Sequence, residues 1–216
     1  MIIRSTVFSM LLTLALLPAA AAAQQGETPH QRLLKRAAES RAKGAESATV
    51  LVYEISDFQC PFCRQFAIDV FPQIDSAFIR TQRVQWVFVN LPMPSHLNAW
   101  VAAEAALCAG AVGDRFWPMH DRLFIAHGEW VNAQDPGQVM TRYARELGVP
   151  MDAFTACVEQ DRVAPLILQD VIFGSRVSGT PTFVVNSAAG AQQTVVGVKT
   201  FAEWREILET ALKRRE

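Results

Sequence analysis

The sequence Cys60-Pro61-Phe62-Cys63 constrains this chain more than any other stretch. An apolar run from Val50 to Ile55 comes just before it and predicts a buried strand, and a helical pattern follows it. The N–H groups at a helix N-terminus favour a thiolate and lower the thiol pKa below its usual value of about 8.5. We therefore expect Cys60 to be the exposed, attacking sulfur and Cys63, one turn further along, to be the resolving thiol.

A Cys-x-x-Cys pair also occurs as half of a zinc site or as a small structural disulfide. The other two cysteines, Cys108 and Cys157, are widely separated, and no histidine lies at zinc-finger spacing from either. A structural disulfide between Cys60 and Cys63 would close too short a loop to stabilise the fold much. A redox centre is therefore the favoured interpretation, and neither a resident metal nor a cofactor is expected.

Residues 1–23 have the pattern of a signal peptide. Arg4 provides a weak positive charge, an apolar stretch runs over residues 7–17, and small residues fill positions 19–23. An uncleaved membrane anchor is the alternative, but Pro18 interrupts the apolar run, which is short for a hydrocarbon core of about 30 Å. We expect cleavage after residue 23, export to the periplasm or another external location, and no stable membrane insertion afterwards.

The mature chain suits one domain, or one domain that carries an insertion. Removal of 23 of the 216 residues leaves 193, and Arg4 is the only charged residue removed, which leaves 19 basic and 21 acidic residues. This balance gives no electrostatic basis for binding nucleic acid or an anionic membrane. All four cysteines remain, an even number, in a compartment where disulfides persist.

The first part of the mature chain predicts a linker and then a strand–helix–strand unit. Residues 24–48 are polar and indicate a frayed helical arm or linker, with a partner-binding arm as the alternative. Residues 49–91 contain apolar strands at 50–55 and 84–89, around an amphipathic helix that we expect Pro72 to kink. This order implies a parallel βαβ unit.

Between residues 92 and 174 strand signals are absent, which predicts an all-helical insertion. Cys108 and Cys157 lie within it and are expected to form a structural disulfide, with a second redox pair as the alternative. Residues 175–216 then add a hairpin and a closing helix that begins with a capping box. The expected helices of the insertion cover residues 99–109, 116–126, 136–148, 152–160 and 163–173.

Three segments together resemble exported DsbA-type thiol:disulfide oxidoreductases, which have a thioredoxin fold. They are the stretch from Glu54 to Cys63, the stretch from Gly179 to Phe183, and Phe116-Trp117 with His120-Asp121. The resemblance spans about residues 49 to 212. It implies an α/β thioredoxin fold, βαβ and then ββα, in which residues 49–91 and 175–216 form the thioredoxin-like domain and residues 92–174 the helical insertion.

The resemblance also implies roles for residues around the cysteines. Pro181 falls where the family holds a cis-proline beside the disulfide, and Thr180 would present backbone groups to an incoming peptide and contact the sulfurs. Pro61 and Phe62 would contribute to substrate binding. Without the family, Gly179-Thr180-Pro181 reads as an ordinary turn that opens a strand.

Glu54 is a carboxylate within an apolar strand, a position that costs several kcal/mol unless the group is paired or protonated. In the family that the chain resembles, an acidic residue at this offset exchanges protons with the resolving thiol, which here is Cys63. The alternative is that Glu54 faces solvent at a strand edge.

The leading hypothesis is a disulfide-forming oxidase that acts on cysteine-containing unfolded or folding proteins. The resemblance implies a membrane redox partner that reoxidises it. Pro61-Phe62 lacks the histidine that many strong oxidants of this family carry between the cysteines, so a reductase or isomerase is an alternative. A non-catalytic module that holds a soft metal through the cysteine pair is another. Surface or capping roles are expected for the histidines, which are His30, His96, His120 and His127.

Overall fold

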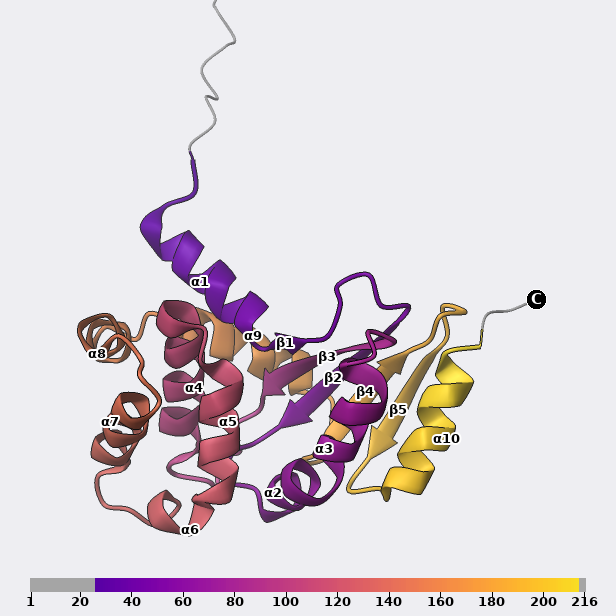
Figure 1. Cartoon of the computed structure of the whole chain (residues 1–216). Helices are drawn as coiled ribbons and strands as arrows, with labels where there is room; N and C mark the ends of the chain where they lie inside the picture. Colours follow the sequence, from indigo (N-terminus) through magenta and orange to yellow (C-terminus); the bar gives the residue numbers. More distant parts are fainter. Residues whose placement is uncertain (1–25, 214–216) are drawn as a thin grey trace, which may run out of the picture.

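The computed structural model describes residues 26–213, so the signal peptide expected over residues 1–23 lies outside the described residues. Its centre is a five-stranded sheet in the order β1-β3-β2-β4-β5 (Figure 1). The β2–β3 pair is parallel and the other pairs are antiparallel. The strands are β1 (Ala42–Lys43), β2 (Val50–Ser56), β3 (Val84–Asn90), β4 (Thr182–Asn186) and β5 (Gln192–Val196).

The two apolar strands expected from the sequence form the parallel centre of the sheet. β2 and β3 pair in register, with Val50 opposite Val84 and Ser56 opposite Asn90. Each strand is one residue longer than its apolar run, because Ser56 and Asn90 continue the ladder as buried polar residues. β2 lies between β3 and β4 and leads directly into the cysteine pair.

The helical segment after the cysteines contains two π-helical turns. It runs through α2 (Pro61–Gln65) and α3 (Phe71–Ile74), with π-helical turns at Phe66–Val70 and Asp75–Ile79. Pro72 has no N–H to donate, and the first π-helical turn comes just before it. The expected irregularity at Pro72 is therefore a local widening of the helix.

Helices cover both faces of the sheet. The α2–α3 segment and α10 (Phe201–Ala211) pack on one face through Phe66, Trp86, Phe183 and Trp204. α9 (Ala164–Gly174) covers the opposite face, where Val171 packs against Ile55, Val89 and Leu91. α10 begins with the expected capping box, in which Glu203 and Thr200 satisfy each other's backbone N–H groups.

The remaining helices gather beside one end of the sheet, around α4 (Figure 1). α4 continues past Gly110, where the sequence predicted its end. A Cβ at Gly110 would lie 2.1 Å from Ser40 Oγ, so this glycine permits close helix packing instead of ending the helix. Residues 92 and 174 as domain boundaries stay a prediction. The helices are α4 (Ala99–Gly113), α5 (Phe116–Ile125), α6 (His127–Trp130), α7 (Pro136–Glu146) and α8 (Met151–Glu159).

The helix expected within residues 24–48 is present, but it is packed against the domain and not frayed. α1 (Pro29–Ser40) begins with a capping box between Thr28 and Gln31. Its residues Leu33 and Ala37 are buried in the same cluster as the alanines of α4. The polar composition concealed this packing because two small or apolar positions on one face suffice when the facing helix presents alanine and glycine.

Cys108 of α4 and Cys157 of α8 form a disulfide, with an S–S distance of 1.98 Å and a Cα–Cα distance of 5.9 Å. Both residues are fully buried. The bond therefore joins two helices of the cluster at a point that a thiol in solution does not reach.

Glu104 on α4 makes the stability of the fold depend on pH. The residue is 5% exposed, Oε1 has no hydrogen-bond partner, and burial together with the charge of Asp161 raises the pKa of the carboxyl to about 7. Because the folded state holds this proton more tightly than the unfolded state, the stabilisation is present below about pH 4.5 and is lost as the pH rises through 7.

We expect Glu104→Gln to raise the free energy of unfolding at pH 8 by about 1 kcal/mol, an effect reduced by partial solvent screening, and to change it little at pH 4.5. Urea unfolding at the two pH values measures this difference. Glu206→Gln, at an exposed position, is the matched control. An equal effect of Glu104→Gln at both pH values would contradict the assignment.

Candidate active site

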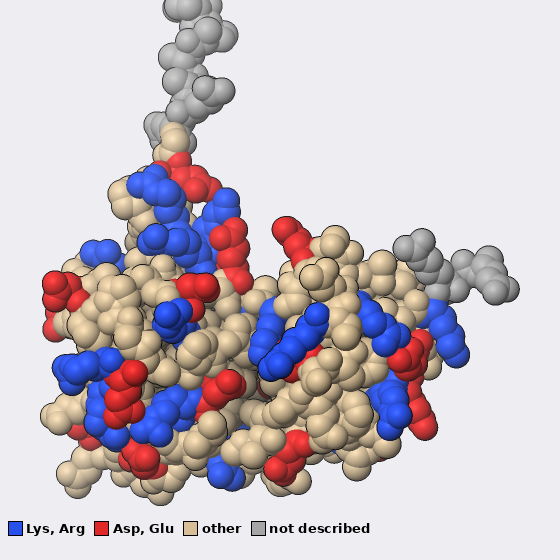
Figure 2. All heavy atoms as spheres, viewed as in Figure 1, with Lys and Arg blue, Asp and Glu red and all other residues tan. Residues whose placement is uncertain are grey.

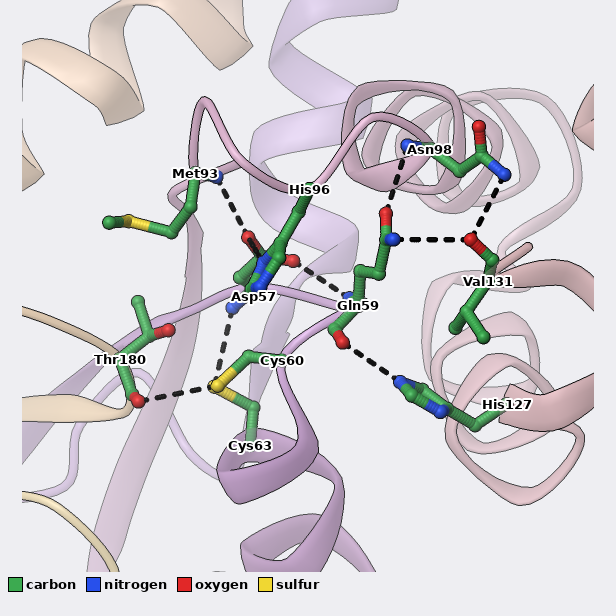
Figure 3. A network of polar contacts seen from close by, with 10 residues as sticks. All are labelled: Asp57, Gln59, Cys60, Cys63, Met93, His96, Asn98, His127, Val131 and Thr180. Atoms are coloured by element: carbon green, nitrogen blue, oxygen red, sulfur yellow. Dashed lines mark hydrogen bonds and ion pairs between the residues drawn. The ribbon is translucent and has the colours of Figure 1, made fainter.

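Cys60 and Cys63 meet at the start of α2, and both are free thiols (Figure 3). Cys60 is the N-cap residue, and Pro61 takes the first helical position. At this position a backbone N–H has no partner within the helix, so a proline costs no helical hydrogen bond. The Cys60 N–H donates to Asp57 O at 3.1 Å, and Cys60 O accepts from Arg64 N–H at 3.0 Å. Cys60, expected to be exposed, is only 5% exposed, and Cys63 is fully buried, so Cys60 alone of the two residues has some contact with solvent.

The surroundings separate the two thiols by protonation state. The Cys63 side chain donates a hydrogen bond to the Cys60 sulfur and is the largest cause that lowers the pKa of Cys60 to about 5. Thr180 and the backbone N–H groups of Phe62 and Cys63 lower this pKa further. Burial, followed by the neighbouring Cys60, raises the pKa of Cys63. At neutral pH Cys60 is therefore a thiolate and Cys63 a thiol. The backbone N–H groups at the helix start, which the sequence analysis emphasised, lower the pKa of Cys60 less than the hydrogen bond from Cys63 does.

The loop before β4 lies against the attacking sulfur. The Thr180–Pro181 peptide bond is cis, and Cys60 Sγ lies 3.4 Å from Thr180 O (Figure 3). Thr182 Oγ1 donates to Gly179 O at 2.7 Å and holds the loop. The turn that the sequence alone suggested thus contacts the redox pair.

A groove with a volume of about 740 Å³ runs beside this loop. Phe62, whose side chain follows Pro61 on α2, is 61% exposed and forms part of the groove wall. Val70, Thr180, Val198 and Phe201 also line it, and Lys199 and Glu203 contribute charges. A largely apolar groove that includes Thr180, the residue in contact with Cys60 Sγ, suits an extended peptide.

Glu54 lies in the central strand β2 and is 1% exposed, so the alternative of a solvent-facing strand edge was wrong. Trp86 Nε1–H donates to Glu54 Oε2 at 2.8 Å. Burial raises the pKa of Glu54, and His120, Trp86 and Ser56 partly offset this effect. Burial therefore favours the protonated form of this carboxyl.

Asp57 organises the loop before Cys60, a role that the sequence did not indicate. Its Oδ1 accepts from Gln59 N–H at 2.7 Å, and Oδ2 accepts from Met93 N–H at 2.8 Å and lies 2.7 Å from His96 Nδ1 (Figure 3). Its own N–H donates to Cys63 Sγ at 3.5 Å. Asp57 thus joins the resolving thiol, through its backbone N–H, to the loop that follows β3, through its carboxylate.

Gln59 connects the loop before Cys60 to the cluster of helices around α4. Its side chain donates to Val131 O at 3.1 Å and accepts from Asn98 N–H at 2.9 Å (Figure 3). His127 Nε2 lies 3.0 Å from Gln59 O, and because a carbonyl oxygen only accepts, the ring donates through Nε2–H. Arg64 Nε–H adds a bond to Phe124 O at 3.0 Å.

His30 is exposed, as expected, but the other three histidines differ from the expectation of surface or capping roles. His120 is 1% exposed and stands within a group of aromatic rings that includes Phe58, Phe88 and Phe124. His96 and His127 both hold the loop around the cysteines. Their sequence spacing carries no signal, because residues from three separate segments meet only after folding.

Within residues 26–213, no group of three or more His, Cys, Asp or Glu side chains is arranged to hold a metal ion. In the same part of the chain, none of the helices combines the length and the apolar character that crossing a bilayer requires. On the face in Figure 2, acidic and basic side chains alternate over the surface.

Comparison with known proteins assigns this fold to a family. The family model described as Thioredoxin matches residues 36–210. Disulfide bond formation protein D of Bacillus subtilis is 28% identical over 181 residues, which are 79% of this chain and 74% of that protein. The crystal structure of Wolbachia pipientis alpha-DsbA1 superposes with a TM-score of 0.69 at 19% identity, covering 79% of this chain and 89% of that one, and confirms the α/β thioredoxin fold.

Some longer proteins are similar to this chain over only a small part of their own length. The Na(+)/H(+) antiporter NhaA 3 of Salinispora tropica is 38% identical over 147 residues, 67% of this chain, but the chain spans only 21% of the antiporter's length. The family match covers most of the described residues and includes the sheet and the cysteine pair. The chain belongs to the thioredoxin family.

Proposed function

We propose that the protein is an exported oxidase that introduces disulfides into cysteine-containing proteins while they fold. The observation that carries this proposal is the difference between the two thiols: the pKa of Cys60 is lowered to about 5, whereas the pKa of buried Cys63 is raised. A stable Cys60 thiolate stabilises the reduced protein, so the oxidised protein readily gives its disulfide away.

The exchange has two steps. A substrate thiolate attacks Cys60 Sγ of the Cys60–Cys63 disulfide, forms a mixed disulfide and releases Cys63, which takes up a proton. A second substrate thiolate then attacks the substrate sulfur of the mixed disulfide and releases the Cys60 thiolate. The substrate gains one disulfide and loses two electrons, which remain on the pair. Because the pKa of Cys60 is about 5, this leaving group needs no proton at neutral pH.

The thiolate pKa indicates the direction of electron flow. Attacking cysteines have pKa values of about 7 in reducing thioredoxin and about 3.5 in the strong oxidant DsbA, with potentials of about −270 mV and −120 mV. A pKa of about 5 for Cys60 predicts a potential between these limits. The absence of a histidine between the cysteines is offset by the hydrogen bonds from Cys63 and Thr180.

Substrate proteins would bind as extended segments across the cis-proline loop. Thr180 would offer backbone groups, and the groove beside Phe62 would accept apolar side chains. Pro61 would keep the start of α2 in place. Repeated turnover requires an oxidant for the reduced pair, and a membrane redox partner supplies it in this proposal. The signal-peptide pattern of residues 1–23 supports an exported location, and the name of the Bacillus relative supports the forming direction.

Redox titration of the Cys60–Cys63 pair against glutathione tests the direction. We expect a potential above about −200 mV and stoichiometric oxidation of a reduced, unfolded substrate protein by the oxidised form. A potential near −270 mV with insulin reduction would assign a reductase, and repair of scrambled disulfides an isomerase. Stoichiometric zinc or copper(I) on anaerobically purified protein, without exchange, would assign the metal-binding module.

A further inference from the structure

Two buried polar atoms on the strand before the cysteines have no hydrogen-bond partner. They are Glu54 Oε1 and Ser56 Oγ. The two residues alternate along β2, so their side chains project to the same face of the sheet. An unpaired buried polar atom lowers the stability of the fold by about 1–3 kcal/mol, so such atoms are rare in folded proteins. Those that are present call for a functional explanation.

The hydroxyl of Ser56 acts on both groups that change protonation in the exchange. It lowers the pKa of the Glu54 carboxyl and also lowers the pKa of the Cys63 thiol, each against a larger effect of burial. Its Oγ makes no hydrogen bond of good geometry to either group. Because Ser56 Oγ has no fixed partner, the hydroxyl is free to donate to one group and accept from the other.

Other contacts leave this route open. Trp86 occupies Glu54 Oε2, and Asp57 N–H approaches Cys63 Sγ at 3.5 Å as a donor, so neither can accept the thiol proton. The titratable groups that act on the pair are His120 of α5, which lowers the pKa of Glu54, and Cys60 of the N-cap, which raises the pKa of Cys63.

We propose that Ser56 relays the proton between the Cys63 thiol and the Glu54 carboxylate. The inference rests on the proposed function, because the proton moves only when the disulfide is exchanged. The transfer from buried Glu54 to the thiol that the family resemblance implies would thus pass through one hydroxyl of the same strand.

The relay balances in both directions. When Cys63 attacks a mixed disulfide on Cys60, the thiol proton passes to Ser56 Oγ as the hydroxyl proton passes to the Glu54 carboxylate. The Cys63–Cys60 bond forms, and the bond from Cys60 to the bound thiol breaks with that thiol leaving as its anion. In the reverse direction protonated Glu54 supplies the proton that Cys63 takes up when it is released. Ser56 ends each cycle unchanged.

The closing step can be measured without a physiological substrate. The reduced protein is mixed with the aromatic disulfide dithiobis-nitrobenzoate. The Cys60 thiolate attacks first and releases one coloured thiolate, and Cys63 then attacks Cys60 and releases the second. The first phase depends on reagent concentration and the second does not. The second phase therefore reports the proton loss and attack of Cys63 alone.

We expect Ser56→Ala to slow the second phase by about 10- to 100-fold near pH 7 and to leave the first phase within about twofold of the wild-type rate. In the wild-type protein the rate of the second phase should rise with pH as Glu54 ionises. In Ser56→Ala this rise should disappear, and the rate should increase only at high pH, where the Cys63 thiol loses its proton directly to solvent. Ser40→Ala, which removes a hydroxyl bonded to Ala37 O on α1, is the matched control and should change neither phase.

A double variant separates a relay from a displaced thiol. If Ser56 and Glu54 form one path, Ser56→Ala in the Glu54→Gln background should add less than about a twofold slowing. The relay is overturned if Ser56→Ala leaves the second phase at the wild-type rate, slows it equally at every pH, or multiplies with Glu54→Gln. Failure of the wild-type protein to oxidise any protein would refute the proposed function while leaving this two-phase result intact.

Discussion

Replacing Cys60 by serine is expected to lower the rate of thiol–disulfide exchange by at least about 1,000-fold, because a serine hydroxyl at neutral pH supplies almost no anion. The wild-type sulfur differs strongly from an ordinary thiol, since its pKa of about 5 makes it almost fully ionised at pH 7. Alkylation with iodoacetamide over a pH series measures this directly. The reaction of the reduced wild-type protein should reach its plateau by about pH 6.5, and Cys60→Ser should show no fast phase.

Variants of Cys63 test why the pKa of Cys60 is low. Since the Cys63 hydrogen bond is the largest cause, Cys63→Ala should shift the alkylation profile of Cys60 to higher pH, and Cys63→Ser, which keeps a donor, should shift it less. Both variants should accumulate a mixed disulfide with a substrate thiol. A profile for Cys63→Ala that coincides with that of the wild type would assign the low pKa to the helix start instead.

The parts of the fold that sequence reasoning reached are those with local signals. Alternation and apolar runs located β2, β3 and β4, and capping chemistry located the start of α10, because these signals act between residues a few positions apart. The extent of α4 and the packing of α1 were missed. Both depend on the close contact between Gly110 and Ser40, which belongs to a helix far away in the chain. The sequence does not distinguish a glycine that allows close helix packing from a glycine that ends a helix.

In the active site too, the features with local sequence signals were predicted and those that join distant segments were not. The cysteine pair is adjacent in sequence, and Glu54 stood out because an acid interrupts an apolar strand. The Asp57–His96 contact and the attachment of Gln59 to the helical cluster join segments about 40 to 70 residues apart. No spacing rule connects such residues, and Asp57 in particular looks like an ordinary loop residue until Met93 and His96 are placed around it.

The disulfide between Cys108 and Cys157 should contribute a large part of the stability of the fold. Its sequence separation of 49 residues corresponds to about 4 kcal/mol in the chain-entropy model, a large part of the 5–15 kcal/mol that stabilises a typical domain. Because both sulfurs are fully buried, a substrate thiol cannot attack them in the folded protein, which opposes a role as a second redox pair.

We therefore expect Cys108→Ala with Cys157→Ala to lower the free energy of unfolding by about 4 kcal/mol in urea at pH 7, because the unfolded chain regains the freedom that the bond removes. Each alanine leaves only a small gap, so the variant should remain folded at low temperature. Both phases of its reaction with dithiobis-nitrobenzoate should match the wild-type rates, since Cys60 and Cys63 are untouched. A loss below about 1 kcal/mol would contradict the structural role, and a folded variant whose Cys60–Cys63 pair no longer turns over would place the second bond in the electron path.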